Sequence, residues 1–196
     1  MNKTERRLGA IMFTDVVGFT ELMSSDESEA LNILQQKNSA VQSQVVDCCG
    51  VYVKSIGDGS LSFFDSAIEA VDCAVKIQKS LNGNISIRIG IHLGEIVHKD
   101  GDVFGDSVNI ANRIEKISKP GGVCISGSVF DQLENKKGYQ FKHLGLHSFK
   151  GVGRLLDIYG LKMSESEIIP HESFPGSNLL TRFYLKYIES NYSKYY

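Results

Sequence analysis

Cysteine is scarce in this sequence, and its placement excludes both a disulfide framework and a zinc-binding motif. Of the four cysteines, Cys48 and Cys49 are adjacent, while Cys73 and Cys124 stand alone, and no C-x-x-C pair occurs. Such usage is typical of a reducing compartment, so we expect a cytoplasmic protein. The five histidines also lack metal-ligand spacing, and we interpret them as surface or hydrogen-bonded residues.

The sequence also lacks a basic excess and a long apolar run. Lys and Arg number 21 and Asp and Glu 23, for a formal net charge of -2, whereas nucleic-acid and membrane-surface binders usually carry a basic excess. No stretch approaches the roughly 20 apolar residues of a membrane span, and the N-terminus has no signal-peptide core. We therefore expect no nucleic-acid partner and no membrane segment in this chain.

Three catalytic signatures are missing as well. The G-x-S-x-G motif of a serine nucleophile and the P-loop motif G-x-x-x-x-G-K-[ST] of ordinary ATPases do not occur. The G-G-D-E-F signature of diguanylate cyclases is also absent. The chain therefore needs another explanation if it is an enzyme.

The composition that is present predicts one folded domain followed by a short C-terminal segment. Hydrophobic residues make up 42% of the 196 residues and charged residues 22%, which is ordinary for a protein with a buried core. The composition shifts near Lys162, so we place a domain over residues 1–161 and a segment over residues 162–196. The segment starts polar and ends in apolar residues at helical spacing, which indicates a small packing helix or, alternatively, a dimerisation or regulatory element. These residues are Leu180, Phe183, Tyr184, Tyr187 and Ile188.

Hydrophobic periodicity predicts an α+β sandwich. The expected order is a strand at residues 8–14, a helix, a hairpin over 51–64, a helix over 66–81, a strand over 85–94, a helix over 105–118 and a strand over 121–127. A short helix over 128–135 and closing strands over 139–149 and 155–161 follow. This order gives a ferredoxin-like βαββαβ core, with helices on one face of a mainly antiparallel sheet.

The first predicted helix has recognisable ends. Ser24 and Glu27 have the spacing of a capping box at its start, and Gly50 fits a C-terminal cap. Between them, apolar residues fall on one helical face, which we expect to be buried. These residues are Leu31, Leu34, Val41, Val45 and Cys48.

One aspartate, Asp15, stands in the apolar run IMFTDVVGFT at residues 11–20. An unpaired buried carboxylate is costly, so Asp15 either reaches solvent at the end of a strand or faces a cation. Asp58 lies at the tip of the predicted hairpin, which neighbours the first strand in a βαββαβ sheet. Carboxylates that lie so close repel each other unless a divalent cation lies between them, and oxygen ligands suit Mg²⁺ or Mn²⁺. For Asp58 alone, the Asp-Gly dipeptide of an ordinary hairpin is the simpler explanation.

The residues after Asp15 indicate a sharp turn. Gly18 lets the backbone turn and lets a ligand approach the main chain. The amides of Val17, Gly18, Phe19 and Thr20 would then form an anion-binding nest.

Asn109 and Arg113 lie four residues apart on the third long helix and therefore share a face. Together they could hold a ribose and a phosphate in a transition state. Taken alone, they fit an ordinary solvated helix face. Lys54 and Asp102 likewise read as surface charges unless something pairs them.

Three segments together resemble the catalytic domain of class III nucleotidyl cyclases, the adenylate and guanylate cyclase family. They are FTDVVGFT at residues 13–20, KSIGDG at 54–59 and DVFGDSVNIANR at 102–113. The resemblance covers roughly residues 6–161, in the family's order and at its spacing, and it matches the adenylate cyclase type.

The resemblance implies a role for each matched residue. Asp15, Val16 and Asp58 would form the site of two Mg²⁺ or Mn²⁺ ions, and Lys54 and Asp102 would read the adenine of ATP. Asn109 and Arg113 would orient the ribose and stabilise the α-phosphoryl transition state, while Lys150 would contact the terminal phosphates. All of these positions carry the residue types that the family uses, which indicates an intact site.

The resemblance also implies an assembly and a reaction. Family catalytic domains form head-to-tail dimers with shared active sites, and this chain carries both halves, so we expect a homodimer. The expected reaction is attack of the ribose 3′-hydroxyl of ATP on the α-phosphorus, with release of pyrophosphate and formation of 3′,5′-cyclic AMP. A guanylate cyclase and a catalytically silent nucleotide-binding domain of the same fold are the alternatives.

Overall fold

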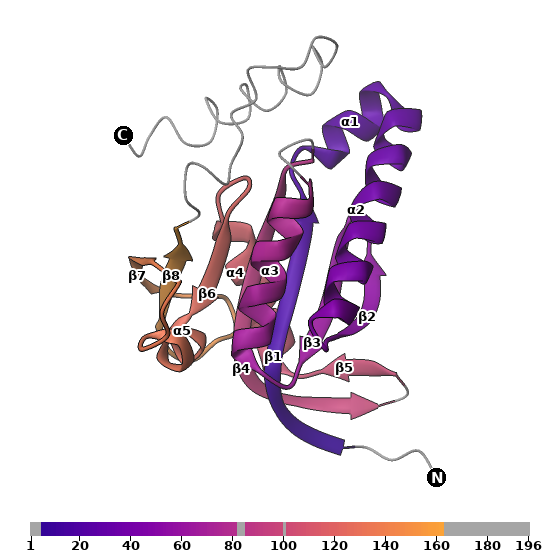
Figure 1. The fold of residues 1–196 in the computed structure, drawn as a ribbon. Coiled ribbons are helices and arrows are strands. Elements are labelled where there is room, and N and C mark those ends of the chain that lie inside the picture. Colours follow the sequence, from indigo (N-terminus) through magenta and orange to yellow (C-terminus); the bar gives the residue numbers. More distant parts are fainter. Residues whose placement is uncertain (1–4, 82–84, 100, 163–196) are drawn as a thin grey trace.

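An eight-stranded sheet organises the computed structural model, which describes residues 5–81, 85–99 and 101–162 (Figure 1). The strands are β1 (Glu5–Val16), β2 (Val51–Ile56), β3 (Gly59–Phe64), β4 (Ile87–Lys99), β5 (Asp102–Phe104), β6 (Val123–Ser126), β7 (Phe141–His147) and β8 (Leu156–Leu161). The helices are α1 (Phe19–Ser25), α2 (Glu27–Asp47), α3 (Ala67–Leu81), α4 (Asp106–Ile117) and α5 (Gly127–Leu133).

β1 lies in the interior of the sheet, whose strand order is β2-β3-β1-β4-β6-β8-β7, with β5 paired to β4. It pairs antiparallel with both β3 and β4, and among the described strands only the β4–β6 pair is parallel. The predicted α+β architecture and mainly antiparallel sheet are therefore confirmed. Asp15 lies near the C-terminal end of β1, in register with Arg88 of β4.

The prediction that the helices lie on one face is wrong for α4. On one face, α2 and α3 pack with alternate β-strand residues such as Met12, Ile89 and Ile91 in the main hydrophobic core, and Figure 1 draws these two helices in front of the strands. The opposite face is covered by α4, whose Ala111 packs with Ile11 and Phe13. The alternation in β4 hid this second layer, because its second face carries Arg88, Gly90 and His92 instead of large apolar residues.

Gly90 allows α4 to lie directly on β4. A Cβ added at Gly90 would lie 2.1 Å from the Glu115 amide nitrogen and 2.6 Å from the Ala111 carbonyl oxygen. Both are backbone atoms, so neither can move aside without shifting the helix. The small residue thus sets how closely α4 approaches the sheet.

The predicted first helix is two helices, and its predicted caps are wrong. Asp26 caps α2, because its carboxylate accepts a hydrogen bond from the Glu29 amide at 3.0 Å. Ser24 lies inside α1 and its hydroxyl donates to the Thr20 carbonyl. At the other end, Cys49 takes the left-handed conformation with φ of 58°, whereas Gly50 makes room for the Phe64 ring, which would lie 2.3 Å from an added Cβ.

The buried stripe of α2 differs from the predicted one. Leu31, which was predicted to be buried, is 51% exposed, because it lies on the side of the helix that faces away from the core. The buried residues are Ala30, Ile33, Lys37, Val41 and Val45. A lysine therefore occupies the middle of an apolar stripe.

Within the described ranges, no helix combines the length and the apolar character needed to cross a membrane. The predicted C-terminal segment lies outside the described residues apart from Lys162. The domain boundary at residue 161 and the packing role of Leu180 to Ile188 remain predictions.

His92 makes the stability of this fold depend on pH. It is 3% exposed, its Nδ1 lies 2.8 Å from the Ser126 hydroxyl, and burial, together with the charge of Arg154, lowers its pKa from 6.5 to about 4. The unfolded chain therefore binds one more proton than the folded chain between these values, so stability is lost as the pH falls through this window. The loss from this group is on the order of 3 kcal/mol.

We expect His92→Gln to reduce the difference in unfolding free energy between neutral and acidic pH, as measured by urea denaturation. His98→Gln, which changes a less buried histidine of the same strand, serves as the control. Equal pH dependence in the His92→Gln chain and the parent chain would contradict the prediction.

Candidate active site

The Asp15 and Asp58 carboxyl groups lie together where β1 meets the β2–β3 hairpin. A Cβ added at Gly59 would lie 2.9 Å from the Thr14 carbonyl oxygen and 3.6 Å from the Asp15 carboxylate, so the hairpin packs closely on the end of β1. Burial and the neighbouring Asp15, which shares a hydrogen bond with it, raise the pKa of Asp58. The expected proximity of the two predicted metal ligands is therefore present.

Lys37 is buried beneath this acidic pair. Its side chain is fully buried, and its ammonium group donates to the Asp58 carbonyl at 3.0 Å and to the Asn38 side chain at 3.3 Å. Burial lowers the pKa of Lys37 to about 8, although Asp58 and Asp15 act in the opposite direction. The lysine thus fixes the backbone of the hairpin turn and adds positive charge beside the carboxylates.

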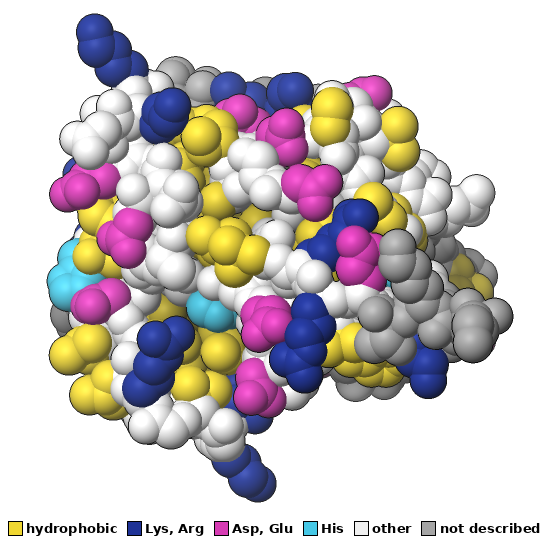
Figure 2. All heavy atoms as spheres, turned by 90° about the horizontal axis from the view of Figure 1, so that it is seen from below, with side chains coloured by type: hydrophobic (Ala, Val, Ile, Leu, Met, Phe, Trp, Pro, Cys, Tyr) yellow, Lys and Arg dark blue, Asp and Glu magenta, His cyan; other side chains and the backbone are white. Residues whose placement is uncertain are grey.

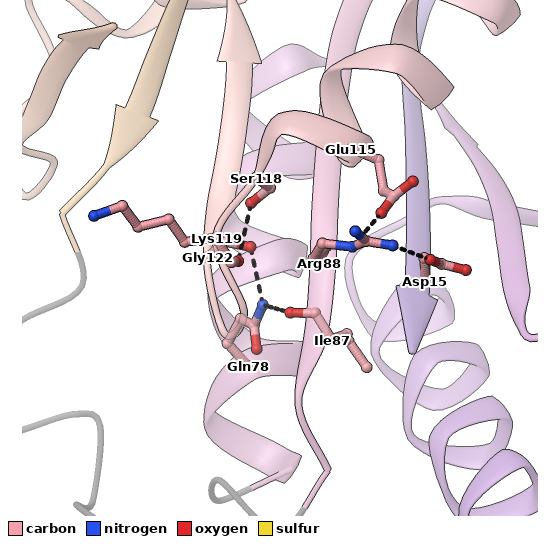
Figure 3. Close-up of polar contacts among 8 residues, drawn as sticks. All are labelled: Asp15, Gln78, Ile87, Arg88, Glu115, Ser118, Lys119 and Gly122. Carbon is pink, nitrogen blue, oxygen red and sulfur yellow. Dashed lines mark hydrogen bonds and ion pairs between the residues drawn. The ribbon is translucent and has the colours of Figure 1, made fainter. Parts of the chain in front are cut away.

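Arg88 lies between Asp15 and α4 (Figure 3). Its guanidinium forms an ion pair with the Asp15 carboxylate, and its Nε lies 2.8 Å from Glu115 Oε1. This second ion pair is almost fully buried on the Glu115 side, where the side chain is 3% exposed. Burial raises the pKa of Glu115 to about 7, and Arg88 only partly offsets this effect.

The donor set around Asp15 fits a divalent cation of the Mg²⁺ class. Both side chains offer only carboxylate oxygens, which such ions prefer. Burial and the neighbouring Asp15 carboxylate raise the pKa of Asp58, and a cation bound between the two carboxylates would offset their repulsion. In the part of the chain that the structure describes, no group of three or more His, Cys, Asp or Glu residues forms a further metal-binding cluster.

Lys54 and Asp102 form an ion pair between β2 and β5. The Lys54 ammonium lies 2.5 Å from Asp102 Oδ2, and this hydrogen bond lowers the pKa of Asp102. Asp102 Oδ1 also accepts from the Val103 amide at 2.8 Å. The side chains remain 41% and 29% exposed, so a ligand can reach both. Their positions in the sequence did not pair these residues, whereas the family resemblance assigned both to the adenine.

Asn109 and Arg113 lie on α4, where Asn109 is exposed and Arg113 half-buried. The loop that carries Lys150 packs on this helix, since Phe149 and Val152 contact its apolar side. A Cβ added at Gly151 would lie 3.9 Å from an Arg113 guanidinium nitrogen. The structure therefore brings Arg113 and the Lys150 loop together.

The turn after Asp15 supports only part of the predicted anion nest. Gly18 takes the left-handed conformation with φ of 72° directly before α1, as expected. The Val17 amide, however, donates to the Ser86 carbonyl at 2.9 Å and is not available to a ligand. Phe19 and Thr20 begin the helix, where amides have no partner within the helix. The side chain of Val16 is buried in the core, so only its backbone can take part in a site.

A match to a protein-family model over most of the chain establishes the family to which the chain belongs. Residues 3–163 match the adenylate and guanylate cyclase catalytic domain. The chain belongs to this family. The matched range includes the Asp15–Asp58 pair, the Lys54–Asp102 pair, and Asn109 and Arg113 of α4.

Relatives of the cyclase domain carry both kinds of name. A Rhizobium meliloti protein provisionally named adenylate cyclase 3 is 35% identical over 79% of this chain. A rat protein named guanylate cyclase soluble subunit beta-2 is 28% identical over 85% of the chain. The chain spans less than a third of the length of each, at 28% in both cases.

Solved structures of cyclase domains have the same fold. A structure described as an adenylate/guanylate cyclase/hydrolase from Silicibacter pomeroyi is 36% identical, with a TM-score of 0.76 over 83% of this chain and 100% of that chain. The adenylyl cyclase CyaB from P. aeruginosa, at 24% identity, has a TM-score of 0.75.

Three polar residues of the cyclase domain site were not predicted from its sequence. Lys37 interrupts an apolar helical stripe, and Arg88 is a charged residue in the first half of β4, between Ile87 and Ile89. Both are visible signals, since a charged residue at a buried position needs a partner. Glu115 gives no such signal, because it follows Arg113 on a helix that also has an exposed face.

Proposed function

We propose that this chain is an adenylate cyclase that converts ATP to 3′,5′-cyclic AMP and pyrophosphate. The observation that carries the proposal is the Lys54–Asp102 pair, which presents a donor and an acceptor side by side in a domain that also carries the Asp15 and Asp58 carboxylates. The family supports a cyclase in general, and this pair supports ATP as the substrate.

The pair matches the hydrogen-bonding edge of adenine. A lysine ammonium donates to N1, and a carboxylate accepts from the N6 amino group. Guanine presents the reverse pattern, with an acceptor at O6 and a donor at N1, and would leave both side chains mismatched. The lowered pKa of Asp102 keeps its carboxylate ionised and ready to accept.

The remaining residues position the reactants and stabilise charge. Asp15 and Asp58 would hold two Mg²⁺ or Mn²⁺ ions through their carboxylates, with Val16 adding only its backbone. Such ions, when bound, neutralise triphosphate charge and lower the pKa of the attacking ribose hydroxyl. Asn109 would orient the ribose, Arg113 would stabilise charge on the α-phosphoryl group, and Lys150 would contact the outer phosphates.

We further propose a head-to-tail homodimer with two shared sites. An apolar surface supports self-association: Figure 2 shows hydrophobic side chains gathered among charged ones on the face seen from below. At this end of the molecule lie the start of β1 and β5 (Figure 1), which carry Leu8 at 68% and Phe104 at 50% exposure. Exposed apolar patches of this kind mark association sites.

Guanylate cyclase activity is the second candidate, since relatives with that name match the chain. A nucleotide-binding domain without catalysis is the third, although the complete set of acidic and basic residues favours an enzyme.

Incubating the purified chain with Mn²⁺ and either ATP or GTP, at two protein concentrations, tests the proposal. We expect cyclic AMP from ATP, with a specific activity that rises with protein concentration because the active form is a dimer. Cyclic GMP as the main product would overturn the base assignment. A folded dimer that binds ATP but forms no cyclic nucleotide would overturn the enzymatic assignment.

A further inference from the structure

A buried lysine on α2 reaches the turn that carries Asp58. Lys37 lies on the buried side of this helix, between Ile33 and Val41, which are about one helical turn away in either direction. Its side chain is fully buried, and its ammonium group donates to the Asp58 main-chain carbonyl at 3.0 Å and to the Asn38 side chain at 3.3 Å. One side chain therefore links the core helix to the tip of the β2–β3 hairpin.

The Lys37 ammonium also acts on both carboxylates of the acidic pair. Burial lowers the pKa of Lys37, whereas the charges of Asp58 and Asp15 act in the opposite direction. Burial and Asp15 raise the pKa of Asp58, and the charge of Lys37 acts against them. The hydrogen bonds that the structure describes for this ammonium go to a carbonyl and an amide oxygen, not to a carboxylate. Lys37 therefore attracts the pair electrostatically and leaves its carboxylate oxygens available to a ligand.

The acidic pair accounts for a charge in this part of the core. Lys37 occupies the middle of an apolar helical stripe, where a methionine would be buried without any loss of charge hydration. A buried ammonium is tolerated when hydrogen bonds and opposite charges compensate for its lost hydration. Arg88 supplies a positive charge on the Asp15 side, and Lys37 supplies one beside the Asp58 turn. The pair thus lies next to a cation that belongs to the protein itself.

A divalent cation bound at the pair would be repelled by the charge of Lys37. Like charges repel, and salt screens them little at buried positions. The lysine has little freedom to move away, because its side chain is enclosed by the core and bonded to the turn. The ammonium therefore lowers the affinity of the two carboxylates for the ion.

We propose that Lys37 is a resident counter-ion of Asp15 and Asp58 that weakens their binding of a free divalent cation. It acts through the two carboxylates and does not touch the cation, so it is a positioning residue and not a metal ligand. The cation concentration that the site requires is then set in part by a residue of the core. This inference rests on the proposed function of Asp15 and Asp58 as metal ligands.

The test measures Mn²⁺ binding by electron paramagnetic resonance, in the absence of nucleotide, so that the readout does not depend on activity. At about pH 7, we expect Lys37→Met to lower the Mn²⁺ dissociation constant about tenfold, because the repelling charge is removed. If Lys37 instead served to hold the Asp58 turn in place for the cation, the same substitution would weaken binding. Weaker or unchanged Mn²⁺ binding in Lys37→Met therefore overturns the proposal. Lys142→Met, at an exposed position of β7, is the matched control and should leave binding unchanged.

Two further substitutions separate the charge of Lys37 from its hydrogen bond. Lys37→Gln keeps a hydrogen-bond donor without a charge and should also tighten Mn²⁺ binding. Lys37→Arg keeps both the charge and the donors and should leave the dissociation constant close to that of the parent chain. Tighter binding in Lys37→Arg but not in Lys37→Gln would overturn the role of the charge. If one of the variants does not fold, either neutral variant still decides, since Mn²⁺ binding that is not tightened in it overturns the proposal.

Asp58→Asn distinguishes failure of this inference from failure of the proposed function. Mn²⁺ binding that is unchanged in Asp58→Asn would refute Asp58 as a metal ligand, and with it the premise. Binding that is lost in Asp58→Asn but not tightened in Lys37→Met would refute the counter-ion role alone. Thermal unfolding of each variant shows whether a change in affinity reflects a general loss of stability, which would weaken binding and so would not mimic the expected tightening.

Discussion

An Asp15→Ala chain and an Arg113→Ala chain, each reduced roughly a thousandfold in cyclase activity, should recover about a quarter of the parent activity when mixed in equal amounts. In a head-to-tail dimer, one site takes its acidic pair from the first chain and its α4 residues from the second. A mixed dimer therefore has one doubly damaged site and one intact site. Half of the dimers are mixed and half of their sites are intact, which gives the expected fraction.

The matched control is a mixture of Asp15→Ala and Asp58→Ala chains. Both changes damage the same half of the site, so each site of a mixed dimer keeps one defect and no activity should return. Cyclic AMP formation from ATP and Mn²⁺ measures both mixtures. Equal recovery in the two mixtures, or none in the first although mixed dimers form, would contradict shared sites.

The combination of Lys54→Glu and Asp102→Cys should shift the ratio of kcat/KM for ATP over GTP by at least about a hundredfold toward GTP. Glutamate accepts from the guanine N1–H and N2 amino groups, and the smaller cysteine removes the carboxylate that would repel the O6 acceptor. The change is large because a bound base covers these two partly exposed side chains, and a wrong base would then leave them without partners.

Both kcat/KM values should be measured with purified chains and Mn²⁺. Lys142→Glu makes the same lysine-to-glutamate change as Lys54→Glu, but at an exposed position of β7, and should leave the ratio unaltered. An unchanged ratio in the double variant, with cyclase activity retained, would remove Lys54 and Asp102 from base recognition.

The proximity of Asp15 and Asp58 could be predicted because short sequence patterns indicate where each of them lies in the fold. A carboxylate after an apolar run predicts the end of a buried strand, and Gly57-Asp58-Gly59 predicts a hairpin tip. In the structure these features bring Asp15 and Asp58 together. The ferredoxin-like order of elements then determines which strands are neighbours.

Other features depend on tertiary packing and were missed or misread. The sheet face that α4 covers was not predicted to be covered. Gly90 has no side chain, and for that reason the α4 backbone can lie directly on it, which no hydrophobic pattern indicates. The core side of α2 includes Lys37 and not the predicted Leu31, because the partner of this buried lysine, the Asp58 carbonyl, comes from a hairpin turn 21 residues later. The partners of Arg88 come from β1 and α4, which lie far apart in the sequence, so no local pattern pairs them.

The acidic half of the site, with Asp15, and the half with Lys54 and Asp102 differ in how easily their surroundings accept substitutions. Asp15 lies on an interior strand that is hydrogen-bonded on both sides, so changes around it disturb the core. Lys54 lies on β2 at the edge of the sheet, and Asp102 lies on β5, a strand of three residues that pairs only with β4. Neither residue belongs to a hydrophobic core cluster, so we expect substitutions at these two positions to leave the sheet and its core intact. With the roles proposed for these residues, the base preference could change without any change at Asp15 and Asp58, and relatives of this chain carry both adenylate and guanylate cyclase names.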